Sequence, residues 1–126
     1  MKKWVFMIHQ LMTVLILLGI MIEFYFAGLG IFHAQSFQLH MVTGEILWVA
    51  SLALFVISLI GMTGRKVIGF SLLLFVLFFI QPLLVQANQS FVQAFHLINA
   101  MFIFAVTLYL LAISFRQSKT MVSARD

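Results

Sequence analysis

Long apolar runs alternate with short polar segments along the chain, and there are four such runs. Each is close to the roughly 20 residues that a helix needs to cross about 30 Å of hydrocarbon. Because lipid cannot satisfy backbone hydrogen-bonding groups, we expect each run to be a helix and the connections to be short. The pattern predicts an all-α, integral membrane four-helix bundle forming one transmembrane domain over residues 1–126, with helices at about Trp4–Leu29, Leu39–Met62, Val67–Val85 and Phe91–Phe115.

The composition excludes several classes of protein. Hydrophobic residues make up 64% of the chain and charged residues only 8%, whereas soluble domains contain about 45–50% and about 25%. The pI of about 10.0 comes from only seven Lys and Arg, so it does not indicate a nucleic-acid binder. The absence of cysteine from the sequence removes disulfides, thiolate metal sites and iron–sulfur clusters. The first run is longer than the roughly 7–15 apolar residues of a signal peptide, so we expect a retained helix.

All basic residues fall on one side of the predicted membrane. They precede the first helix, separate the second from the third, and follow the fourth, which under the positive-inside rule makes both termini cytoplasmic. The loops Gly30–Gln38 and Gln86–Ser90 then face outward. We expect a multi-pass protein of the plasma membrane, bacterial in origin. The residues that set this orientation are Lys2, Lys3, Arg65, Lys66, Arg116, Lys119 and Arg125.

The second and fourth predicted helices carry the same succession of side chains on one face. Residues three, four and seven apart share a helix face, and the two faces match at an offset of 56 residues. Both helices run from outside to inside, so we expect two pseudo-repeated helix pairs with their histidines face to face. The matching faces are His40, Gly44, Leu47, Ser51, Leu54 and Ser58, and His96, Ala100, Ile103, Thr107, Leu110 and Ser114.

Two opposed imidazoles above small residues favour haem as the ligand. Catalytic zinc typically takes three protein ligands, whereas haem iron takes two axial ligands and its flat macrocycle needs small residues where helices approach it. We therefore predict one haem b per chain, with His40 and His96 as axial ligands of the iron and Gly44 and Ala100 beside the macrocycle. Each histidine also has a plainer interpretation, in interfacial or packing contacts. A second haem lower in the bundle is not expected, because Leu54 and Leu110 occupy the corresponding positions.

Other polar residues lie in or near the predicted spans. Glu23, Glu45 and Gln81 fall in the same outer layer as the two histidines, where carboxyl groups are costly unless protonated, paired or turned inward. Glu45 is roughly 140° around its helix from His40, so a direct bond between them is not expected. His33 is interpreted as a solvated loop residue within reach of a haem propionate, and His9 as structural.

Three short motifs resemble a known family. His40-Met41-Val42-Thr43-Gly44, Gln81, and His96-Leu97-Ile98-Asn99-Ala100 are similar to one four-helix half of haem A synthase, and to small four-span bacterial membrane proteins with the same layout. The resemblance covers nearly the whole chain. It implies that His40 and His96 bind the iron, with Thr43, Gln81 and Asn99 near the cofactor. In the haem-processing half of that synthase a Glu lies three residues before the first His, but here the position is Phe37, so the resemblance is to the cofactor-holding half.

Together these observations predict a membrane cytochrome b-like protein acting in electron transfer or haem handling. Six-coordinate bis-His iron favours electron transfer over oxygen activation, and whether the chain is an enzyme on its own is left open. A homodimer, a redox partner or a quinone are the expected partners besides lipid, with no nucleic acid. Two alternatives remain at this point: a small proton- or cation-coupled transporter or channel using Glu23 and Glu45, and a non-catalytic accessory subunit of a membrane complex.

Overall fold

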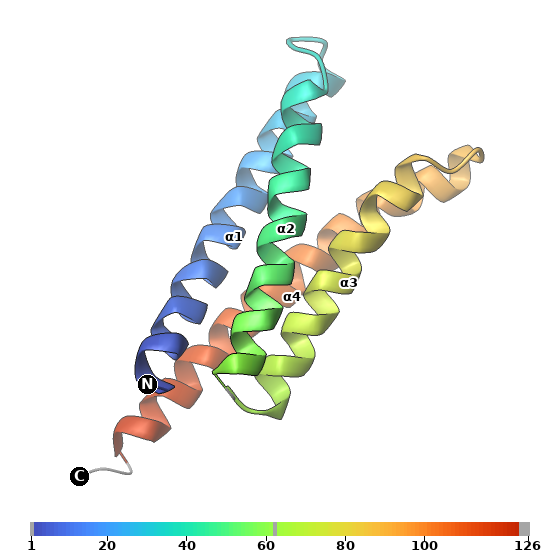
Figure 1. The fold of residues 1–126 in the computed structure, drawn as a ribbon. Coiled ribbons are helices and arrows are strands. Elements are labelled where there is room, and N and C mark those ends of the chain that lie inside the picture. The colour runs from blue at the N-terminus through green and yellow to red at the C-terminus, as the bar shows by residue number, and fades with distance from the viewer. Residues whose placement is uncertain (1, 62, 124–126) are drawn as a thin grey trace.

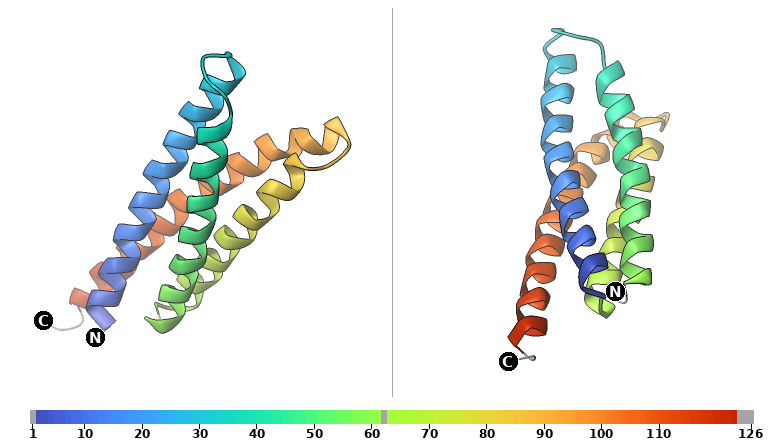
Figure 2. Two further views of the ribbon diagram at one scale, coloured as in Figure 1. Left: turned by 45° about the horizontal axis from the view of Figure 1, so that its top comes forward. Right: turned by 60° about the vertical axis from the view of Figure 1, so that its left-hand side comes forward.

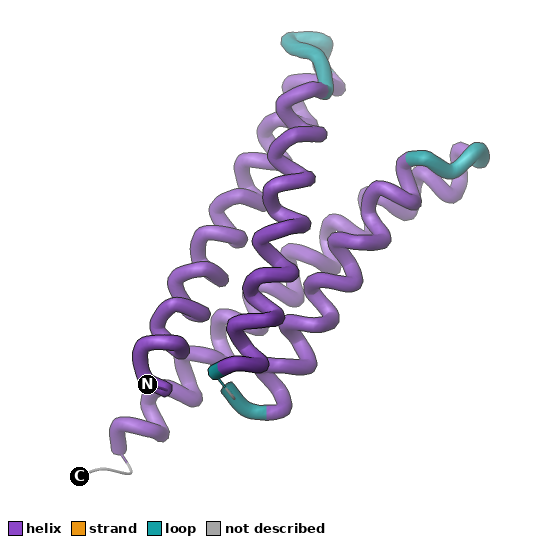
Figure 3. Tube along the Cα trace, viewed as in Figure 1, coloured by secondary structure: helices purple, strands orange, loops and turns teal. Residues whose placement is uncertain are grey.

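The computed structural model describes residues 2–61 and 63–123. Within those ranges the chain forms four helices, α1 (Lys2–Ile31), α2 (Gln38–Ile60), α3 (Arg65–Val85) and α4 (Ser90–Ser123), and no strand. Short connections join the helices, as Figure 3 shows. Each helix is long and apolar enough to cross a membrane. The prediction of an all-α membrane bundle is therefore confirmed, and the chain is a multi-pass membrane protein.

The helix ends differ from the predicted ones where a hydrophobic run ends but residues of high helix propensity continue. α4 continues to Ser123, well beyond the expected end at Phe115. The residues that follow Phe115 include Arg, Gln and Lys, which are good helix formers, and contain no Gly or Pro to stop the helix. The end of a hydrophobic run thus marks the end of the membrane-spanning part and not of the helix. Met62 and Arg125 lie outside the described residues.

The four helices pack in a ring in chain order, so that α1 lies diagonally opposite α3 and α2 opposite α4. Both termini and the turn between α2 and α3 lie at one end of the bundle, called here the terminal end (Figure 1). Gly64 in that turn has a φ of 101°, which side chains rarely tolerate. The loops 32–37 and 86–89 lie at the opposite end, called the loop end (Figure 1). The cytoplasmic location of the termini stays a prediction.

The core lies in the half of the bundle nearest the terminal end. Leu54, Leu74 and Leu110 are completely buried there. Toward the loop end the hairpins α1–α2 and α3–α4 diverge, as Figure 1 and the left view of Figure 2 show. Between Ile20 and Leu47, which includes the ends of α1 and α2 at the loop end, most side chains are exposed or only half-buried. The four helices therefore pack closely at the terminal end and lie farther apart at the loop end.

The two matching faces predicted for α2 and α4 turn into the bundle. From Leu47 to Ser58 and from Ile103 to Ser114, every stripe residue is buried. The structure adds a second correspondence, between the buried faces of α1 and α3 at a constant offset of 58 residues. Its pairs are His9 with Val67, Thr13 with Ser71, Ile16 with Leu74, Ile20 with Phe78, and Glu23 with Gln81.

Buried hydroxyl groups in this core bond mainly within their own helices. Ser51 donates to the carbonyl of Trp48 and Thr107 to that of Ile103, at 2.6 and 2.7 Å. A hydroxyl satisfied in this way is small and costs little to bury, so it lets neighbouring helices approach. Gly19 serves the same purpose without a hydroxyl, since a Cβ there would lie 2.5 Å from Leu47 Cδ2.

Candidate functional site

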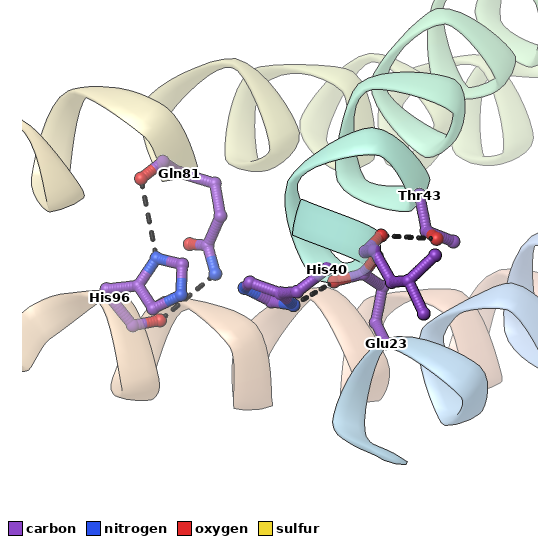
Figure 4. A network of polar contacts seen from close by, with 6 residues as sticks. Glu23, His40, Thr43, Gln81 and His96 are labelled. Atoms are coloured by element: carbon purple, nitrogen blue, oxygen red, sulfur yellow. Dashed lines mark hydrogen bonds and ion pairs between the residues drawn. The ribbon is translucent and has the colours of Figure 1, made fainter. Parts of the chain in front are cut away.

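Each helix contributes one polar side chain to a layer near the loop end. We call Glu23 from α1, His40 from α2, Gln81 from α3 and His96 from α4 the polar layer, and Figure 4 shows the four together. Glu23 and Gln81 occupy corresponding positions of α1 and α3, and His40 and His96 corresponding positions of α2 and α4. The layer thus has approximate twofold symmetry in position but not in chemistry.

His40 is paired with a carboxylate. Its Nδ1 lies in ion-pair contact with Glu23 Oε2 (Figure 4), and the side chains are 24% and 12% exposed. The other carboxylate oxygen, Oε1, is buried and has no hydrogen-bond partner among the described residues. It lies about 4.0 Å from where a Cβ on Gly44 would be. Gly44 therefore leaves room beside the carboxylate that a larger side chain would take.

His96 is paired with a neutral group. Its Nδ1 lies 3.4 Å from the carbonyl oxygen of Gln81, while Gln81 Nε2 donates to the carbonyl of His96 at 3.1 Å. Asn99 Nδ2 donates to the carbonyl of Leu77 at 2.8 Å and to Gln81 Oε1. These bonds tie α4 to the last turns of α3, where Pro82 interrupts the helical hydrogen-bond ladder.

Both histidines direct Nδ1 to an oxygen atom, the carboxylate of Glu23 or the carbonyl of Gln81. A neutral ring that donates Nδ1–H to such an oxygen keeps its lone pair on Nε2. Figure 4 shows these two Nε2 atoms on the sides of the rings that face each other. The ring centres are 6.1 Å apart and the ring planes are inclined by 85°. The layer therefore presents the Nε2 atoms of two histidines to one space between diagonal helices.

Such a pair suits an ion that takes two protein ligands. A metal bound at about 2 Å from each imidazole nitrogen holds the two ring centres about 6 Å apart, which is the spacing observed. Metal-binding histidines almost always donate their other N–H to a carboxylate or a backbone carbonyl, and here each Nδ1 lies beside such an oxygen. No group of three or more His, Cys, Asp or Glu capable of holding a metal occurs in the described part of the chain. The donor set of the layer thus offers two imidazole ligands, as many as the axial positions of a haem iron take.

The remaining predicted residues divide between the layer and its surroundings. Gly44 and Ala100 lie one turn below the histidines, and Asn99 contacts Gln81. Thr43 donates to the carbonyl of Leu39 in its own helix at 2.8 Å. His33 is an exposed loop residue with a φ of 58°, a conformation that His tolerates better than most residues do.

Glu45 and His9 lie apart from the polar layer. Glu45 is exposed and lines a shallow depression with Val42, Ile46 and Val49, all on the surface of α2. His9 is completely buried toward the terminal end, with Nε2 3.1 Å from Ser71 Oγ. Its surroundings are those of a packing residue. A joint site formed by Glu23 and Glu45 receives no support from this arrangement, because Glu23 is turned to His40.

Sequence reasoning missed the contact between Glu23 and His40. It placed both residues in one layer but left Glu23 without a named partner. The match between the faces of α1 and α3, which pairs Glu23 with Gln81, indicates only that Glu23 is turned into the bundle and does not name its partner. The bond between Asn99 and Gln81 was also missed, since nothing in the sequence shows how far apart two helices lie.

Comparison with known proteins gives a family but no activity. Residues 23–88, rather more than half of the chain, match a family of unknown function, DUF6220. The matched stretch contains Glu23, His40 and Gln81 and ends before His96. No curated protein and no solved structure matches the chain.

Proposed function

Since the chain belongs to this family of unknown function, we propose a function from the geometry of its own polar layer. The protein holds one haem b in the membrane, near the loop end, with His40 and His96 as the axial ligands. It acts in electron transfer or in haem handling, in the plasma membrane of a bacterium. The bound haem would supply a one-electron redox centre.

One observation carries this proposal: the two Nε2 atoms face each other from rings whose centres are 6.1 Å apart. The Nδ1 atom of His40 contacts Glu23, and that of His96 lies 3.4 Å from the carbonyl oxygen of Gln81, so both rings have a neighbour that orients them. Two preoriented ligands of this kind bind a metal without the entropic cost of ordering them.

The surroundings of the pair agree with a large flat ligand. The hairpins diverge toward the loop end (Figure 2), and the residues one turn below the histidines are Gly44 and Ala100. Phe37 and Phe95, next to the layer in sequence, are both substantially exposed. Apolar side chains of this kind would cover a macrocycle and exclude water from the iron ligands.

Two strong ligands also limit the chemistry. With both axial positions taken by imidazole, electron transfer is favoured, because activation of oxygen requires an open position on the iron. The residues of the chain then act by binding and orienting the group, and not by attacking a substrate. Its electron donor and acceptor would be membrane partners, a quinone or a second copy of the chain.

Absorption spectroscopy of the detergent-purified protein tests the proposal. We expect a low-spin spectrum in the oxidised and dithionite-reduced protein, and its broadening or loss in both His40→Ala and His96→Ala. His33→Asn is the matched control, because it removes a loop histidine and keeps a residue that tolerates the φ of 58°. A folded wild-type protein that stays colourless after incubation with haemin would refute the proposal and revive a transport role for Glu23.

The two variants of the proposal differ in how firmly haem is held. Loaded protein mixed with an excess of a high-affinity haem acceptor distinguishes them. Retention of the low-spin spectrum over hours indicates an electron-transfer cofactor, whereas transfer within minutes indicates haem handling.

A further inference from the structure

The two halves of the polar layer correspond in position but differ in charge. Glu23 and Gln81 stand at equivalent places on α1 and α3, yet His40 contacts a carboxylate and His96 a neutral carbonyl. We infer that Glu23 is a positioning residue that makes His40 the stronger of the two ligands and holds the reduction potential of the site low. This inference rests on the proposed function.

The charge of Glu23 has little to offset it. One of its oxygens contacts His40 Nδ1, and the other is buried without a hydrogen-bond partner among the described residues. The sequence contains no Lys or Arg between Lys3 and Arg65, nor between Lys66 and Arg116. Every basic residue before Arg125 is therefore in a segment at the terminal end, far from the layer.

An unbalanced carboxylate behind one ligand has two physical effects. A histidine that donates Nδ1–H to a carboxylate becomes a more basic ligand at Nε2 and keeps a fixed orientation. Negative charge in a site of low dielectric constant also favours the oxidised, more positive state of a metal. The carbonyl of Gln81 does neither to the same degree, since it is uncharged and lies 3.4 Å from His96 Nδ1.

A redox titration of haem-loaded Glu23→Gln tests the effect on potential. Gln is close to Glu in size and shape, removes the charge and keeps one oxygen that can accept from His40. At a fixed applied potential we expect the ratio of reduced to oxidised protein to rise at least tenfold, equivalent to a positive shift of about 59 mV for a one-electron couple. The spectrum should stay low-spin, because His40 is still present.

Glu45→Gln is the matched control for this titration. It removes the same charge from a second carboxylate near the loop end, but one that lies on the surface of α2 with Val42 and Ile46. A shift confined to Glu23→Gln supports the inference. Equal shifts in both variants, or none in Glu23→Gln, would overturn it while leaving the haem proposal intact.

A second measurement does not depend on haem. In the haem-free protein, ¹⁵N NMR of the imidazole rings reports which nitrogen carries the hydrogen. We expect His40 to carry it on Nδ1 in the wild type and to populate both forms in Glu23→Leu, with His96 unchanged. His40 protonated at Nε2 in the wild type would overturn the positioning role, even if the protein binds no haem.

Discussion

The half of the bundle near the termini and the half near the loops consist of the same four helices but use different contacts. Near the termini, leucines from three helices are completely buried and the hydroxyl groups bond mainly within their own helices. Near the loops the hairpins diverge (Figure 1), and side chains such as Glu23, Gln81 and Asn99 reach across helices. The comparison shows that packing of apolar side chains holds the helices together at one end of the bundle. At the other end, polar side chains make contacts between the helices.

Truncation in the packed half should have the largest effect on stability. Leu110→Ala removes a completely buried side chain, and the cavity left behind should cost about 2–5 kcal/mol of unfolding free energy. Leu97→Ala, on the same helix but 68% exposed near the loops, is the control and should change stability by less than about 0.5 kcal/mol. Denaturation of the purified protein in detergent measures both. Equal losses would show that the two halves contribute alike.

A smaller effect is expected where α1 and α2 approach each other at Gly19. The side chain in Gly19→Val would overlap Leu47, since even a Cβ lies 2.5 Å from Leu47 Cδ2, and such overpacking costs about 1–3 kcal/mol. Gly28→Val introduces the same residue into the same helix, where a Cβ meets nothing within 4 Å. The difference between the two midpoints of thermal unfolding therefore isolates packing from helix propensity. Equal midpoints for the two variants would mean that the overlap with Leu47 does not destabilise the protein.

The smallest effect belongs to the polar contacts near the loops. Asn99→Leu removes the bonds to Leu77 and Gln81, and hydrogen bonds between membrane helices average about 0.6 kcal/mol. Thr43→Val is the control, because its hydroxyl bonds only within α2. We expect a slight loss of stability in Asn99→Leu and none in Thr43→Val. A loss larger than that of Leu110→Ala would reverse the comparison between the two halves.

Much of this fold could be predicted, because a membrane imposes strong rules on sequence. Apolar runs gave the number of helices, and the repeated faces gave the residues that turn inward, including Ser51 and Thr107. The pairing of His40 with His96 was predicted from the same repetition. Each of these inferences uses periodicity within one helix, which the sequence records directly.

Features that depend on how two helices are rotated and spaced could not be predicted. The contact between Glu23 and His40 joins α1 to α2, and the divergence of the hairpins depends on the sum of many side-chain volumes. The extension of α4 to Ser123 lies outside the membrane-spanning part, where hydrophobicity carries no information about helix length. By contrast, the separation of Glu45 from His40 follows from helical periodicity alone, and Glu45 is indeed exposed on the surface of α2.

Because the core lies at one end of the bundle, a small rotation of a hairpin at the core displaces its far end by a larger distance. From Ser58 in the core to His40 in the polar layer, α2 extends about 27 Å at about 1.5 Å per residue. A rotation of about 5° at the core moves the far end of such a rod by about 2 Å, close to the length of one metal–nitrogen bond. Small changes of packing among Leu54, Leu74 and Leu110 are therefore amplified at the histidines. Core residues that contact neither histidine thereby set the tolerance with which the two imidazoles meet.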